Sequence, residues 1–291
     1  MMAALIQVVI GGLLQGGMYA LGAFGLSLVF GVLGILNVTH GDFLMLGGLL
    51  CYGAYVVLGL DPLVSLLIVV PVFFGVGCLF EHVLIQPLLA KSPHELLMGS
   101  ILVTLGAALA IEDLVPFMWT QSFSGIPYTM RSLVIGEIVV PTLRLAILLG
   151  IVVLTLMLHL FLRHTFVGIA LRAMTQNRPG AMLVGINLPR LSMLAFGLGT
   201  ALVATAGVAQ VTLYSITPTM GLPLTLKYLT IVVLGGLGSL PGSVFGGMVL
   251  GLCEALTSLY IGPQWAPTVA FTVLIVALVA RPQGLFGARR P

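Results

Sequence analysis

Long stretches without a charged residue constrain the fold of this chain more than any other feature. Residues 145–162, for example, read LAILLGIVVLTLMLHLFL, with no Asp, Glu, Lys or Arg. Only 7% of the 291 residues are charged and 59% are hydrophobic, whereas an ordinary soluble protein has roughly 25% charged residues. Because 11 Lys+Arg and 8 Asp+Glu cannot cover so large an apolar core, the surface of this protein must face lipid.

The length of the apolar segments predicts helices. A bilayer core about 30 Å thick needs about 20 residues per helix, and a membrane β-barrel would alternate apolar and polar positions, which this chain does not do. We therefore expect an all-α polytopic membrane protein with a single domain over 1–291 and about eight to nine transmembrane segments. The apolar segments are 4–36, 43–60, 62–85, 96–119, 138–162, 190–213, 226–257 and 265–280.

Two of these segments, 4–36 and 226–257, are longer than one crossing needs, and both are rich in glycine. Long, glycine-interrupted apolar segments are typical of broken or re-entrant helices. A long tilted helix packed through its small residues is the alternative. We expect breaks near 37–42 and 235–242. The second would be a hairpin, since glycine allows a positive φ angle and proline stops a helix; its turn residues are Gly235, Gly236, Gly238, Pro241 and Gly242.

Arginine residues predict the orientation of the chain. The segment 163–190 contains four arginines and no acidic residue, and the carboxyl terminus contains three more, Arg281, Arg289 and Arg290. By the positive-inside rule both regions are cytoplasmic. An even number of crossings must then separate them, which holds only if 226–257 folds as a hairpin. The loop at about 119–138 is then external.

A group of polar residues interrupts the apolar sequence in NVTHGDFLMLGG at 37–48. Polar side chains inside a membrane normally face a cavity, a partner chain or one another. One interpretation is structural: Asn37 and Asp42 cap the two helix ends, Gly41 makes the bend, and His40 contacts Asp42. The second places Asn37, Thr39, His40 and Asp42 along a translocation path. The third is a simple cytoplasmic helix end.

The arginine-rich segment is too long for a simple turn. RAMTQNRPGAMLVG, within 164–194, is able to form a short amphipathic helix, with Asn177 as its cap and Pro179 in its first turn. Such a helix can lie on the membrane or dock in a groove of a cytoplasmic partner. It can also be no more than a positively charged loop that fixes the topology.

Four stretches, in order along nearly the whole chain, resemble the branched-chain amino-acid permease family of ATP-binding-cassette (ABC) importers. They are GLLQGGMYALGAFGLSLVFGVLGILNVTHGDFLMLGG at 12–48, GIALRAMTQNRPGAMLVGINLPRL at 168–191, VVLGGLGSLPGSVFGGMVLGL at 232–252 and RPQGLFG at 281–287. The second resembles the cytoplasmic coupling loop of such permeases. It lacks the Glu-Ala-Ala triplet that begins the general coupling motif, so the contact is assigned to a segment at about 164–190 and not residue by residue.

This resemblance implies a multi-pass permease subunit of a bacterial inner membrane, with a cytoplasmic carboxyl terminus. Its implied partners are a homologous second permease, two cytoplasmic ATPase subunits and an external substrate-binding protein. The implied substrates are amino acids, with leucine, isoleucine and valine the first candidates. The candidate residues for coupling to the ATPases are Arg172, Gln176, Asn177, Arg178 and Gly185.

The absence of a GxxxxGK[ST] phosphate loop indicates that ATP is hydrolysed by separate subunits and that this chain is not an enzyme. We expect no cofactor, no metal site and no nucleic-acid partner. The main alternative function is a proton- or ion-coupled secondary transporter that works without ATPases, because such carriers use intramembrane His and Asp residues as relays. The acidic residues near membrane segments have no obvious basic partner; they are Asp42, Glu81, Glu112, Asp113 and Glu254.

Overall fold

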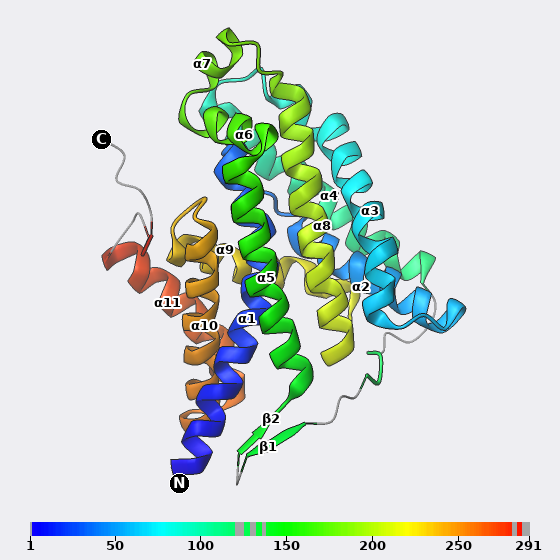
Figure 1. The fold of residues 1–291 in the computed structure, drawn as a ribbon, viewed down its shortest axis with the longest axis vertical. Helices are drawn as coiled ribbons and strands as arrows, with labels where there is room; N and C mark the ends of the chain where they lie inside the picture. The colour runs from blue at the N-terminus through cyan, green and yellow to red at the C-terminus, as the bar shows by residue number, and fades with distance from the viewer. Residues whose placement is uncertain (1, 120–124, 129–131, 136–137, 281–283, 287–291) are drawn as a thin grey trace.

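The computed structural model describes residues 2–119, 125–128, 132–135, 138–280 and 284–286, and these residues are almost entirely helical (Figure 1). The helices are α1 (Met2–Leu33), α2 (His40–Leu58), α3 (Pro62–Phe80), α4 (Pro93–Met118), α5 (Thr142–His164), α6 (Phe166–Gln176), α7 (Arg178–Leu183), α8 (Leu188–Leu213), α9 (Gly221–Gly235), α10 (Leu240–Tyr260) and α11 (Ala266–Ala280). A small antiparallel ribbon of β1 (Leu133–Ile135) and β2 (Ile138–Val140) lies in the predicted external loop.

Eight helical segments within the described residues are long and apolar enough to cross a membrane. They comprise α1 to α5, α8, α9 with the short turn before it, and α10; the apolar α11 is shorter. The predicted all-α polytopic class and the number of spans are therefore confirmed. Side-chain caps begin six of the helices; the capping residues are Asp61, Ser92, Thr165, Asn177, Asn187 and Ser239.

Helix α1 runs through the centre of the bundle and is the most deeply buried of these spans. Its 32 residues, at 1.5 Å per residue, make it about 48 Å long. It packs antiparallel against α10, with Gly12 and Gly16 against Gly251 and Gly247, so that backbone meets backbone. A Cβ atom on Gly16 or Gly251 would overlap the other helix. Glycine is therefore required at this contact.

The glycine-rich run in the first segment does not break the helix, contrary to the expectation of a broken segment there. Residues 11–25 are all helical, and α1 ends only at Leu33, where Gly34 has a φ angle of 66°. The chain then runs without helix to His40, so the predicted break near 37–42 is confirmed at 34–39. The alternative of a long helix packed through small residues is the correct one for α1.

The second predicted break is also confirmed. Helix α9 ends at Gly235, and the chain turns through Gly236 and Gly238, with φ angles of 102° and 80°, before α10 begins. The final described residues return to this turn, since the N–H group of Leu285 donates to Leu234 O at 2.9 Å. The prediction for the carboxyl terminus concerns Arg281, Arg289 and Arg290, which lie outside the described residues.

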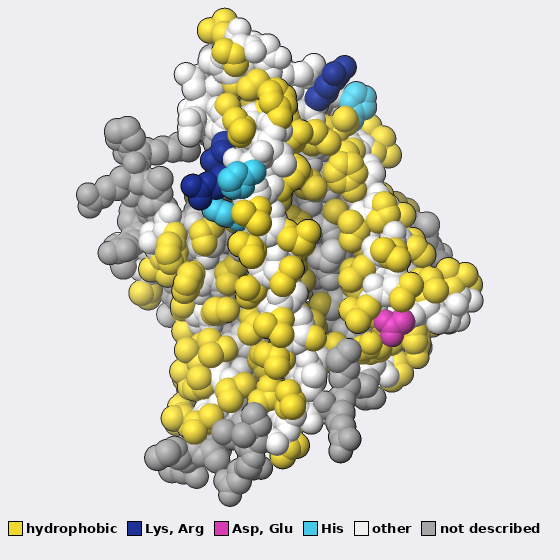
Figure 2. Space-filling view, in the orientation of Figure 1, with side chains coloured by type: hydrophobic (Ala, Val, Ile, Leu, Met, Phe, Trp, Pro, Cys, Tyr) yellow, Lys and Arg dark blue, Asp and Glu magenta, His cyan; other side chains and the backbone are white. Residues whose placement is uncertain are grey.

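The two ends of the bundle differ in charge. Helices α6 and α7 form one end, and the ribbon and the start of α1 form the other (Figure 1). On the face drawn in Figure 2, the Lys, Arg and His side chains gather near the α6–α7 end, above a broad hydrophobic surface. From α7 the chain passes along α8, α9, α10 and α11 in order.

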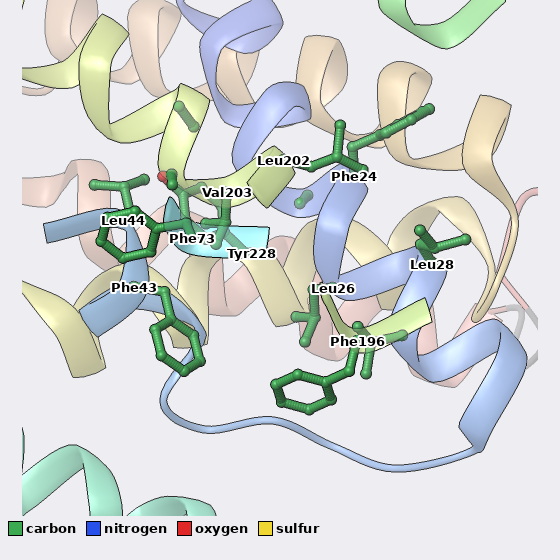
Figure 3. Close-up of a cluster of buried hydrophobic side chains, with 14 of the residues drawn as sticks. Phe24, Leu26, Leu28, Phe43, Leu44, Phe73, Phe196, Leu202, Val203 and Tyr228 are labelled. Atoms are coloured by element: carbon green, nitrogen blue, oxygen red, sulfur yellow. The ribbon is translucent and has the colours of Figure 1, made fainter. Parts of the chain in front are cut away.

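Aromatic side chains fill the core between the central helices. Figure 3 shows Phe24 of α1, Phe43 of α2 and Phe196 of α8 among the buried side chains of this cluster. Phe43 packs edge-on against Phe80, with ring centroids 5.2 Å apart, and Phe80 stacks on Phe196 at 5.5 Å. Such ring contacts add to the area they bury. They hold α2, α3 and α8 together.

The glycine contact between α1 and α10 generates a stability prediction. Gly251→Ala should lower the free energy of unfolding by about 1–3 kcal/mol, because the added methyl group overlaps the backbone of Gly16. Thermal unfolding of the detergent-solubilised chain measures the change. Gly106→Ala is the matched control, since a Cβ atom there meets nothing within 4 Å, and it should be neutral or stabilising by up to about 1 kcal/mol. Equal melting temperatures for the two variants would contradict the role of the contact.

Candidate functional site

Helices α2 and α9 both begin part of the way along α1, and their first turns meet. His40 at the start of α2 hydrogen-bonds Gly22 of α1 at 2.8 Å, so α2 starts well inside the bundle. Gly41 packs against Gly221, the first residue of α9, so closely that a Cβ atom on either would overlap the neighbouring helix. We call residues 37–42 and 221–225 the polar junction.

At the polar junction, hydrogen bonds within the chain pair backbone groups that the helix break leaves without a partner in their own helix. The Gly41 N–H donates to Thr225 Oγ1 at 2.7 Å, and Thr225 Oγ1 donates to Val38 O at 2.9 Å. Thr39 Oγ1 donates to the carbonyl of Thr104 on α4 at 2.8 Å. Backbone groups freed by a helix break must find such partners because lipid offers none. The junction therefore ties α2, α4 and α9 together.

The four path candidates are all buried: Asn37, Thr39, His40 and Asp42 are each at most 2% exposed. Asn37 accepts a hydrogen bond from the Thr39 N–H at 3.1 Å. The expected contact between His40 and Asp42 does not form, because the His40 Nε2–H donates to the Gly22 carbonyl instead. The expectation that Gly41 makes the bend is also wrong, since Gly41 is helical and Gly34 has the positive φ angle.

Neither carboxylate oxygen of Asp42 has a hydrogen-bond partner within the described part of the chain. Asp42 lies in the first turn of α2, and its Oδ1 atom is beside Gly221 at the start of α9. The partial positive charges of both helix starts therefore face this carboxyl group. Glu112 of α4 also reaches the junction, where it accepts the Leu222 N–H at 3.4 Å. Away from the junction, Glu81 accepts the Ser192 hydroxyl.

The arginine-rich segment forms two short helices at one end of the bundle. The predicted cap is confirmed, because Asn177 Oδ1 accepts the Gly180 N–H at 2.9 Å and starts α7. Gly185 ends this helix with a φ angle of 85°, where a side chain would strain the backbone. Leu183 and Val184 project from α7, 89% and 76% exposed.

The other candidate residues of this segment lie on the same two helices. Arg172 is in the last turns of α6, where its Nη2 donates to the carbonyl of Arg163 at 3.3 Å. Gln176 is the final residue of α6 and is exposed, and Arg178 is the first residue of α7. The five candidates are therefore close along the chain at one end of the bundle.

A cleft of about 520 Å³ opens in the half of the bundle nearer the ribbon. Its lining comes from the first half of α1, the start of α5, the end of α8, and from α9, α10 and α11. Six of its polar side chains form two groups of hydrogen-bonded or ion-paired residues. We call these the cleft cluster: Tyr19, Lys227 and Glu254, with Gln15, Arg144 and Tyr214.

An ion pair is the centre of the cleft cluster. Lys227 Nζ lies 2.9 Å from Glu254 Oε1, and the Tyr19 hydroxyl donates to Glu254 Oε2 at 2.7 Å. Lys227 also lies over the Tyr19 ring, 4.4 Å from its centroid. In the second group, Arg144 donates to the Tyr214 hydroxyl at 3.0 Å, and this hydroxyl donates to Gln15 Oε1 at 2.7 Å.

Sequence reasoning missed this pair. Glu254 was expected to have no obvious basic partner, and that expectation is wrong. Lys227 and Glu254 lie on the two arms of the predicted hairpin, so their opposite charges could have predicted the ion pair. No group of three or more His, Cys, Asp or Glu that could hold a metal ion occurs among the residues that the structure describes.

Comparisons with known proteins place the chain in a family. Residues 8–278 match the family described as the permease component of branched-chain amino acid transport systems. The chain is 30% identical to the high-affinity branched-chain amino acid transport system permease protein LivH of Escherichia coli, over 97% of this chain and 95% of that protein. It is 31% identical to the corresponding protein BraD of Pseudomonas aeruginosa, with the same coverage.

A solved structure, PsaBC from Streptococcus pneumoniae in complex with Fab, matches 98% of both chains with a TM-score of 0.52. At 12% identity this likeness reports a shared fold alone. The family match covers nearly the whole chain, and the membrane-spanning architecture agrees with it. The chain is therefore a multi-pass membrane protein that belongs to the permease family of branched-chain amino acid transport systems.

Proposed function

We propose that this chain is a permease subunit that imports branched-chain amino acids, with leucine, isoleucine and valine as substrates. The support is the family match over residues 8–278 and the likeness to the branched-chain amino acid permease proteins LivH and BraD, which extends over 97% of this chain.

The energy for import would come from two cytoplasmic ATPase subunits that dock at α6 and α7. The observation that carries this proposal is the exposure of large apolar side chains at the bundle end where cationic residues gather. Leu183, Val184 and Phe166 are 89%, 76% and 82% exposed there. Apolar side chains projecting from a short, capped helix suit a groove on a partner protein. The candidate contacts Arg172, Gln176, Asn177 and Gly185 would belong to the surrounding surface, and the candidate Arg178 begins α7.

The α6–α7 end would be cytoplasmic in a bacterial inner membrane, since loops rich in arginine stay inside. The ribbon end and the start of α1 would then be external, where a substrate-binding protein delivers the amino acid. The carboxyl terminus would be cytoplasmic, because residues 284–286 pair with the α9–α10 turn and that turn packs against Gly31 near the end of α1.

The polar junction would border the translocation path formed with a second, homologous permease. Asn37, Thr39, His40 and Asp42 are buried, so their proposed role is to hold the starts of α2 and α9 in place. The carboxylate oxygens of Asp42 have no hydrogen-bond partner within the described residues. Asp42 would therefore be the member of this group whose contacts change when the path opens.

Uptake in cells tests the proposed substrate. A bacterial strain without its own branched-chain amino-acid uptake systems, expressing this chain with its partner subunits, should accumulate labelled leucine. Unlabelled isoleucine and valine should compete, and fructose should not, because the proposed substrates are branched aliphatic amino acids. Uptake of another class of solute that leucine does not inhibit would contradict the proposal.

The docking surface generates a second prediction. Leu183→Asp should reduce co-purification of the ATPase subunits about tenfold or more, because a charge replaces an apolar anchor at the centre of the contact. Affinity purification from solubilised membranes measures the amount retained. Leu237→Asp is the matched control: Leu237 is also an exposed leucine, 47% exposed, but lies in the α9–α10 turn. Full retention of the ATPases by the Leu183 variant would refute the assigned surface.

A further inference from the structure

We propose that the cleft cluster binds the two charged groups of the amino acid as it passes through this chain. The α-carboxylate would approach Lys227 and Arg144, and the α-ammonium group would approach Glu254. This inference rests on the proposed function, and it adds a substrate site that differs from the polar junction. Its ligand class is the zwitterion of an α-amino acid with an aliphatic side chain.

The position of the ion pair is the first argument. Lys227 and Glu254 belong to helices that otherwise consist of apolar and small residues, and both lie within candidate membrane spans. Charged side chains at such positions are costly and rare, and they mark substrate or ion pathways. The packing of α1 on α10 relies on glycine and needs no charge. A structural role therefore accounts poorly for the pair.

The remaining hydrogen-bonding capacity of the pair is the second argument. A lysine ammonium group has three donor hydrogens, and Lys227 makes one hydrogen bond among the described residues, to the Tyr19 hydroxyl, beside its ion pair with Glu254. A carboxylate has about four acceptor positions, and Glu254 accepts one side-chain hydrogen bond, from Tyr19 at Oε2, while its buried Oε1 faces Lys227 and has no hydrogen-bond partner in this part of the chain. Both ions therefore keep hydrogen-bonding capacity that the described residues do not use.

The exposure of the Lys227 and Glu254 side chains agrees with a role in binding a ligand. The Lys227 side chain is 23% exposed and that of Glu254 is 9% exposed, and both line the cleft. Tyr19 bridges them and fixes their positions. A ligand that enters the cleft thus meets a cation and an anion side by side, which is the complement of a zwitterion.

The rest of the cleft suits an aliphatic side chain. Gly11 leaves open space beside it, and Val8 and Leu224 supply apolar walls of the cleft. The volume of about 520 Å³ lies within the range of roughly 300–1,000 Å³ that is usual for small-molecule sites. A lining that combines charged groups with apolar walls matches the two parts of leucine, isoleucine or valine.

Exchanging the charges of Lys227 and Glu254 distinguishes a role in substrate binding from a structural role. The test uses the complete importer in liposomes, and measures the initial rate of leucine uptake and the amount of assembled complex. Lys227→Met and Glu254→Gln should each lower uptake about tenfold or more without loss of assembly. The double variant Lys227→Glu/Glu254→Lys keeps the ion pair but reverses its direction, and should remain as inactive as the single variants. Lys91→Met, at an exposed lysine in the loop before α4, is the control and should transport normally.

Labelling of a cysteine measures occupancy of the cleft directly. Ser258 is exposed and lines the cleft, so Ser258→Cys, in a background with Cys51, Cys78 and Cys253 replaced by alanine, should react with a polar maleimide. Millimolar leucine should slow this reaction severalfold, whereas 4-methylpentanoate and isopentylamine, which each carry one of the two charges, should not. Ser132→Cys, an exposed position just before β1, should react at the same rate with or without leucine.

Two results would overturn the inference. One is recovery of uptake by the charge-exchanged variant, which would make the pair structural. The other is equal protection by leucine and by its singly charged analogues. Both results leave leucine transport by the wild-type importer intact. Failure of the proposed function would be distinct, because the wild-type importer would then transport no branched-chain amino acid at all.

Discussion

Direct backbone contact between α1 and its neighbours is the interaction on which the rest of the structure depends. Lipid is as apolar as the helices, so association inside a membrane depends on close packing rather than on the hydrophobic effect. Glycine pairs supply it: Gly16 meets the backbone of α10, and Gly25 meets that of Gly199 in α8. The same pairs shape the cleft, because Gly12 and Gly251 both belong to its lining. The contact that fastens α1 to α10 therefore also forms part of the cleft wall.

The second constraint is that lipid cannot satisfy free backbone groups. The chain interrupts its helices at two places near α1, and at each it finds partners within the protein. At the polar junction Thr225 bonds Val38 and Gly41, which joins α2 to α9. At the α9–α10 turn, residues 285 and 286 donate to the carbonyls of Leu234 and Gly235. At the polar junction this pairing allows α2 and α9 to begin part of the way along α1.

The membrane class, the approximate spans, the α9–α10 hairpin and the Asn177 cap could be predicted from the sequence because each depends on local composition or a local turn. The glycines of α1 could not be separated from those of a true break, since glycines that pack against another helix look the same in sequence as glycines that turn the chain. Proline and the capping Ser239 accompany the break at 235–242, and residues 11–25 contain neither proline nor such a cap. The Lys227–Glu254 pair and the His40–Gly22 bond required the tertiary arrangement, which places residues far apart in the sequence side by side.

Identifying the energy source for transport is the most direct test of this account. The account requires transport by this chain to depend on ATPase subunits at the α6–α7 end. Leucine uptake should be measured in liposomes that contain either the complete importer or this chain alone, with ATP and a proton gradient supplied separately. The account predicts uptake only by the complete importer, only with ATP, and at a rate that the proton gradient does not change. Uptake by the isolated chain in response to a proton gradient would contradict it and would identify a secondary transporter.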